Sequence, residues 1–156
     1  MARMNSRVRH GFDSLLRLSD GLTAYTSAGA NWTEVASVDA FLDLHALTEA
    51  YWDNKEIAIA EEFAIELNIL TADDADGTET YVIQVQVDAV STFDDNPATV
   101  LEYTHTRGTT GLRHLAVSRA QLQELDYEAR YLRLVVFAGG DTPSMTLEAF
   151  VAPVRN

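Results

Sequence analysis

The stretch TYVIQVQVDA, residues 80–89, decides the fold class of this chain. Its odd-numbered positions from Tyr81 to Ala89 are all apolar, whereas Gln84, Gln86 and Asp88 occupy even-numbered positions. Alternation with a period of two, in a run rich in β-branched residues, predicts a strand with one buried and one solvated face. The polar stretch 71–77 precedes it, and residues 63–69 before that alternate in the same way. These two strands are therefore expected to form a hairpin or a pair that crosses over at one end.

The remainder of the second half repeats this pattern. Residues 100–105 predict a further strand, and residues 112–117 are its possible partner across the turn at 107–111. Residues 131–137 are almost continuously apolar, as in a central strand that is covered on both faces. After a glycine-containing turn, residues 145–151 alternate once more and predict a closing strand.

Other segments give weaker signals. Ser118 and Gln121 have the spacing of a capping box, which predicts a single helical turn after residue 118. In the first sixty residues, 22–25, 35–38 and 41–44 are candidates for short strands. Short strands between polar turns, without the long helices of a parallel α/β fold, predict an all-β sandwich with two packed sheets. We expect an extended N-terminal arm over residues 1–20 and one sandwich domain over 21–156.

The charge of the chain restricts its partners. The net charge is −13, so the protein is expected to avoid direct contact with nucleic acids, whose phosphates attract basic surfaces. Four arginines against Asp13 give residues 1–17 a charge of +3, which leaves −16 for the remainder. A basic arm on an acidic body predicts docking onto an acidic neighbour. No apolar run reaches 18 residues, so we expect no membrane contact, and we expect synthesis in the cytoplasm without an export signal.

A search for catalytic or metal-binding patterns gives no candidate. There is no cysteine, and the four histidines lack the spacing of a metal site. His105 and His114 flank the 107–111 turn and are expected to form a cross-strand surface pair. The acidic stretch 73–79 does not fit the EF-hand register, because Ala72 and Ile83 would fall at positions that require acids. We therefore expect no enzyme activity, no cofactor and no metal.

Several elements of the second half together resemble a known family. They are a strand ending in VQVD (85–88), the segment RYLRL (130–134), the Gly139-Gly140 turn and a final strand, TLEAFV (146–151). This arrangement resembles the jelly-roll cement, or decoration, proteins of tailed bacteriophages, of the podovirus type with a non-covalent chainmail shell. The likeness covers roughly residues 62–154 and rests on packing and turn signals.

The resemblance implies both a fold and a function. The fold would be a jelly-roll β-sandwich. The protein would be made in the host bacterial cytoplasm and would bind the outer surface of the phage head. It would bridge neighbouring subunits of the major capsid protein and contact other copies of itself, as a homodimer or homotrimer at shell symmetry axes. Candidate contacts are arginines of the arm and large aromatic residues: Arg3, Arg7, Arg9, Trp32 and Trp52.

Two other functions remain open at this point. The first is a carbohydrate-binding jelly-roll module, on a fibre or secreted, in which sugars stack on aromatic rings in the first third of the chain. Loss of glycan binding on Trp52→Ala would favour it. The second is a hydrolase that uses a pair of its 24 acidic residues, although no pattern selects a pair.

Overall fold

A computed structural model of the chain describes residues 16–44, 62–75, 77–94, 96–125 and 128–153. These residues form antiparallel sheets with one short helix, which confirms the all-β prediction. The strands of the first part are short: β1 (Arg17–Asp20), β2 (Gly29–Trp32), β3 (Glu34–Val35), β4 (Val38–Asp39) and β5 (Phe41–Asp43). The later elements are longer: β6 (Glu62–Ala72), β7 (Thr80–Asp88), β8 (Ala98–Thr104), β9 (Gly111–Ser118), α3 (Arg119–Leu125), β10 (Tyr131–Gly139) and β11 (Met145–Pro153).

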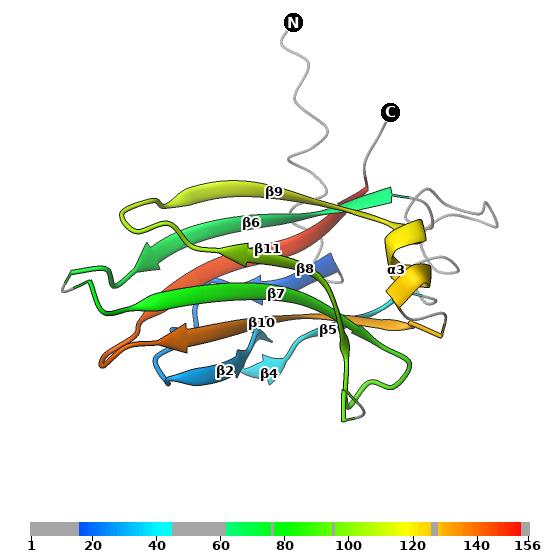
Figure 1. Cartoon of the computed structure of the whole chain (residues 1–156), viewed down its shortest axis with the longest axis horizontal. Helices are drawn as coiled ribbons and strands as arrows, with labels where there is room; N and C mark the ends of the chain where they lie inside the picture. Colours follow the sequence, from blue (N-terminus) through cyan, green and yellow to red (C-terminus); the bar gives the residue numbers. More distant parts are fainter. Residues whose placement is uncertain (1–15, 45–61, 76, 95, 126–127, 154–156) are drawn as a thin grey trace, which may run out of the picture.

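The strands form two layers (Figure 1). The first sheet has the order β1-β11-β6-β9. The second has the order β2-β10-β7-β8, and β5 also pairs with β10, beside the half of that strand that β2 leaves uncovered. Together β2 and β5 thus occupy one strand position next to β10. Residues 17–20, the end of the predicted arm, form β1 and pair with β11, so the sandwich begins before residue 21.

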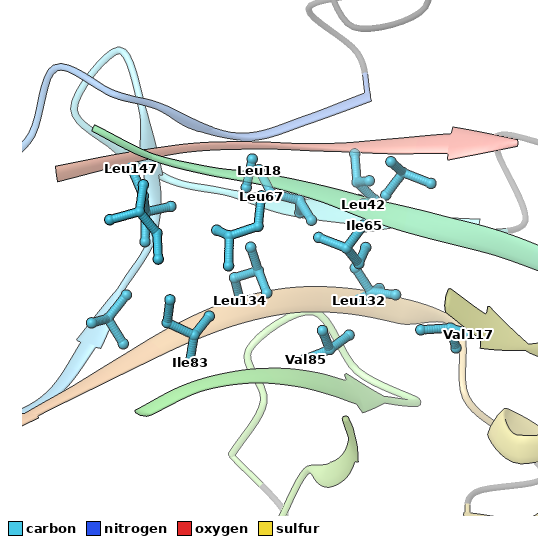
Figure 2. Close-up of a cluster of buried hydrophobic side chains, with 14 of the residues drawn as sticks. Leu18, Leu42, Ile65, Leu67, Ile83, Val85, Val117, Leu132, Leu134 and Leu147 are labelled. Atoms are coloured by element: carbon cyan, nitrogen blue, oxygen red, sulfur yellow. The ribbon is translucent and has the colours of Figure 1, made fainter. Parts of the chain in front are cut away.

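The period-two alternation places one apolar face of each sheet against the other. Leu134 on β10 and Ile83 on β7 meet Ile65 and Leu67 on β6 between the layers, and all four side chains have no exposed surface (Figure 2). Burial of such side chains contributes about 2 kcal/mol each and is the main force that holds the sheets together. Figure 1 shows the β6–β7, β8–β9 and β10–β11 connections at one end of the sandwich and α3 at the other.

The structure tests the sequence predictions for the second half. β6 and β7 belong to different sheets, so they form the crossing pair rather than a hairpin. The predicted pairing of residues 100–105 with 112–117 is wrong, because β8 pairs with β7 and β9 pairs with β6. The turn at 107–111 carries the chain from one sheet to the other. The capping box is confirmed, because the Ser118 amide donates to Gln121 and the Gln121 amide donates to the Ser118 hydroxyl before α3.

A short hairpin, β3–β4, projects between β2 and β5. The amide of Ala40 donates to the carbonyl of Thr33 at its base, and the Asp20 carboxylate accepts the Ala36 amide at 2.7 Å near its tip. Its two turn residues, Ala36 and Ser37, have φ of 52° and 63°. Two positive φ values are the geometry of a type I′ turn, which favours Asn-Gly rather than Ala-Ser.

The strain in this turn gives a stability prediction. Ser37→Gly is expected to raise the free energy of unfolding by about 0.5–1 kcal/mol, because glycine adopts positive φ without the steric cost of a Cβ atom. Chemical denaturation would measure the change. Ser27→Gly is the matched control, since Ser27 is exposed and has no positive φ, and it is expected to be neutral or slightly destabilising. Equal effects of the two changes would contradict the assignment of strain.

Candidate interaction surface

The outer face of the second sheet carries aromatic side chains where a solvated sheet normally carries polar ones. Trp32 lies opposite Val135, and Phe41 lies opposite Arg133, in the pairing of β2 and β5 with β10. Tyr131 lies opposite Asp88 of β7. Directly opposed residues in a sheet share a face. Arg133 and Val135 alternate with Leu134, which faces the core, so these side chains lie on the side away from the core. We call the surface of Trp32, Phe41, Phe93 and Tyr131 the aromatic face.

Arg133 lies at the centre of the aromatic face, between two rings. Its guanidinium carbon is 3.7 Å from the ring centre of Trp32 and 4.1 Å from that of Phe93. Its Nε and Nη2 donate to the Gln86 side-chain oxygen at 3.1 and 3.0 Å. The residue is only 8% exposed. Such stacking between rings is worth about 1–2 kcal/mol per ring when the cation is partly removed from water.

The loop after β7 closes over this arginine. Phe93 is 6% exposed and adopts a φ of 54°, an unusual conformation for a bulky residue. At the start of the loop, the buried Asp88 carboxylate accepts the Val90 amide through Oδ1, whereas its Oδ2 accepts no hydrogen bond in the structure. The Arg133 stack therefore holds this loop, through Phe93, against the face of the sheet.

A row of polar side chains continues across the same face to its far edge. Gln86 donates from its amide to Gln84 at 3.0 Å, and Gln84 donates to Glu102 on β8 at 2.9 Å. The Thr99 hydroxyl donates to Gln84 as well. These bonds fix the side-chain orientations from Arg133 to the β8 edge. The outer face thus has an aromatic half and a hydrogen-bonded polar half.

A second pair of rings lies beside the stack, on β5 and β10. Phe41 and Tyr131 meet edge to face, with their ring centres 5.6 Å apart and an angle of 82° between the planes. Arg130 lies over Tyr131 at 5.0 Å and donates through Nε and Nη2 to the Asp43 carboxylate, with a shortest distance of 2.7 Å. Phe41 is nevertheless 45% exposed, and Trp32 is 40% exposed. Large rings held in place but open to solvent are typical of binding surfaces.

Acidic residues surround the arginine at the centre. Burial lowers the pKa of the Arg133 guanidinium, and the negative charges of Asp88, Asp39 and Asp94 act in the opposite direction. An arginine stays protonated at neutral pH even so. Three carboxylates against one guanidinium leave the local field negative. Asp39 and Asp94 are exposed, so this field reaches solvent.

A separate polar cluster surrounds Asp74 in the β6–β7 loop, at the end of the sandwich opposite α3. Its Oδ2 lies 3.2 Å from Nε2 of the buried His105 and accepts the Gly108 amide at 2.8 Å. Burial raises the pKa of Asp74, but the bonds from Gly108 and His105 outweigh it and leave the pKa below its ordinary value of 3.8. This carboxylate joins the β6–β7 loop to the β8–β9 turn, which is a structural role.

The depressed pKa of Asp74 predicts acid sensitivity. A lowered pKa in the folded state gives stability that is present above pH about 4 and is lost as the pH falls further. Asp74→Asn is expected to cost about 1 kcal/mol at pH 7 and to lie closer to wild-type stability at pH 2.5, because the wild-type carboxyl takes up a proton as the pH falls. Thermal unfolding at both pH values measures this, with the exposed Asp141→Asn as control. If the stability difference between Asp74→Asn and the wild type were the same at both pH values, the lowered pKa of Asp74 would be refuted.

The structure places only part of the predicted site. Trp32 lies on the aromatic face, as a solvent-exposed ring on Arg133. Arg3, Arg7, Arg9 and Trp52 lie outside the described residues. The expected surface pair of His105 and His114 is wrong, because the strands beside them belong to different sheets: His105 contacts Asp74, and His114 contacts Glu66 at 2.8 Å.

Arg133 is the residue of this surface that sequence reasoning missed. It belongs to the RYLRL segment, whose pattern predicts a buried central strand but no binding residue. A charged residue inside an almost continuously apolar strand was the available signal, because a buried charge requires partners. Its partners Trp32, Gln86 and Phe93 are too distant in sequence to be found by spacing.

The described ranges contain neither a candidate metal site nor a helix that could cross a membrane. No group of three or more histidine, aspartate or glutamate side chains in those ranges has the arrangement of a metal site. Within the same ranges, no helix has the length and apolar character needed to cross a membrane. Comparison with known proteins adds no assignment: the chain matches no family model, no curated protein and no solved structure.

Proposed function

We propose that this chain is a jelly-roll cement protein, a non-enzymatic subunit that binds the outer surface of a tailed-phage head and bridges neighbouring subunits of its major capsid protein. The observation that carries the proposal is the aromatic face, in which the exposed rings of Trp32 and Phe41 are held by contacts with Arg133 and Tyr131 on an acidic sandwich. Such a surface suits contact with another macromolecule. The sequence resemblance specifies which one, and the strand order is compatible with it.

The strand order supports the jelly-roll part of the proposal. With β2 and β5 counted as one position, the described residues place eight strand positions in the two large sheets, four in each, besides the β3–β4 hairpin. Each successive strand crosses to the other sheet, except that β7 and β8 are neighbours in one sheet. Two Greek keys arranged in this way make a jelly roll, an architecture that viral capsid and lectin domains use.

The charge distribution supports a position on the outside of the shell. A body with net charge −16 beyond residue 17 is repelled by packaged DNA. The basic segment that contains Arg3, Arg7 and Arg9 would contact acidic groups of the shell, and Trp32 and Trp52 would provide apolar contacts. Copies grouped as dimers or trimers would match the symmetry axes of a shell. Binding at many sites would then oppose opening of the shell.

Deletion of residues 1–10 tests the role of the basic segment. The truncated chain is expected to bind purified heads at least about 10-fold more weakly than the full chain, because three charge-assisted contacts are lost. Co-sedimentation with heads that lack the protein measures the affinity. The charge-neutral triple substitution of Arg3, Arg7 and Arg9 by glutamine separates charge from length. Unchanged binding in both variants would remove this segment from the proposal.

One observation favours a second candidate function, a carbohydrate-binding module. The exposed ring of Trp32 lies on the same sheet face as the polar row of Gln84, Thr99 and Glu102, and sugars combine ring stacking with such hydrogen bonds. A glycan array would test it. Specific binding that is lost on Trp32→Ala or Trp52→Ala would favour this function over the cement role.

A further inference from the structure

The aromatic face has the properties of a pre-organised docking surface. Trp32 is fixed on Arg133 and Phe41 is fixed on Tyr131, so neither ring loses much conformational freedom when a partner binds. Low entropy cost and large contact area are what make aromatic residues dominate interfaces.

The charges around these rings select the chemistry of the partner. Asp39 and Asp94 are exposed near Arg133, and Arg130 is already occupied by Asp43. A second copy of the chain would bring the same carboxylates against this surface and would be repelled, because the net charge of each copy is −13. A basic partner, in contrast, gains attraction from the carboxylates and from the exposed ring of Trp32.

We propose that the aromatic face is the surface that meets the partner, and that the group seated on it is a cationic side chain, an arginine or lysine, of a basic protein surface. This inference rests on the proposed function, and it assigns the basic surface to a part of the shell other than the acidic groups that Arg3, Arg7 and Arg9 would contact. The guanidinium or ammonium group lies over the exposed side of Trp32, within reach of Asp39 and Asp94. Phe41 packs against apolar atoms around that cation.

The test compares the binding of variants of the full chain to purified heads that lack it. Trp32→Ala removes the ring, and the double variant Asp39→Lys with Asp94→Lys reverses the field without touching the core. Each is expected to weaken binding roughly 30-fold or more, as for central interface residues. Raising the salt concentration should weaken wild-type binding steeply and affect the charge-reversed variant much less.

Two matched controls lie away from the aromatic face. Leu112→Ala truncates an exposed apolar side chain on β9, and Asp141→Lys reverses an exposed charge in the β10–β11 turn. Both are expected to bind within about 2-fold of the wild type, as surface changes outside an interface do. Thermal unfolding of every variant verifies that the sandwich is folded. Phe41→Ala, which leaves the Arg133 stack intact, gives a second measurement if Trp32→Ala unfolds the chain.

The outcomes distinguish the inference from the proposed function. If Trp32→Ala, Phe41→Ala and the charge-reversed variant all bind heads as tightly as the wild type does, the inference is overturned. The cement role is then unaffected. Failure of the wild-type chain to bind heads would overturn the cement role itself. A homo-oligomer that dissociates on the charge reversal, measured by sedimentation, would make a second copy the occupant and also overturn the inference.

Discussion

Replacing Arg133 with alanine is expected to lower the free energy of unfolding by about 3 kcal/mol. The change removes two ring contacts and both hydrogen bonds to the buried Gln86 oxygen. It also leaves the buried Asp88 carboxylate without its neighbouring cation. Removing one partner of such a buried arrangement costs more than the arrangement itself contributes, because the groups that remain lose their compensation.

The neighbouring Arg130 provides the matched control. It also contacts a ring and a carboxylate, but its side chain is 45% exposed. Arg130→Ala is expected to cost far less than Arg133→Ala, because an exposed ion pair contributes little to stability. Urea denaturation followed by circular dichroism gives both values, and the fluorescence of Trp32 should shift to longer wavelength in Arg133→Ala alone. Similar costs for the two arginines would contradict the role assigned to the stack.

Leu134→Ala is expected to have the largest effect of any single truncation considered, a loss of about 3–4 kcal/mol. Leu134 lies in the middle of β10, has no exposed surface, and faces the opposite sheet in Figure 2. The surrounding strands are tied into both layers, so the cavity cannot close by local movement. Leu112→Ala, at a side chain that is 62% exposed, is expected to cost less than about 0.5 kcal/mol. Equal costs would mean that the two sheets do not enclose the core described above.

The strands of the second half could be predicted because their pattern is long. β7 and β10 run for nine residues each, enough for period-two alternation or continuous burial to be recognised. Alternation defines the buried face of a strand but not the sheet that it joins. The predicted pairing of β8 with β9 is therefore wrong, because the turn between them connects strands of two different sheets rather than two neighbouring strands of one sheet.

The first half was less readable for a different physical reason. The strands described before residue 45 are two to four residues long, and the edge position beside β10 is shared by β2 and β5 around the β3–β4 hairpin. The short strands β2 and β5 form because they pair with the distant β10, and their own sequence patterns are too short to predict them. The same holds for the site: Trp32 was identified as a large aromatic, but its contact with Arg133 joins residues about one hundred positions apart.

The most direct test of the cement role is quantitative mass spectrometry of purified tailed-phage particles from the host in which this chain is made. The abundance of the chain is compared with that of the major capsid protein in the same particles. The proposed function predicts near-stoichiometric amounts, as for a subunit that covers the whole shell. Absence of the chain from the particles, or only a few copies in each, would contradict it.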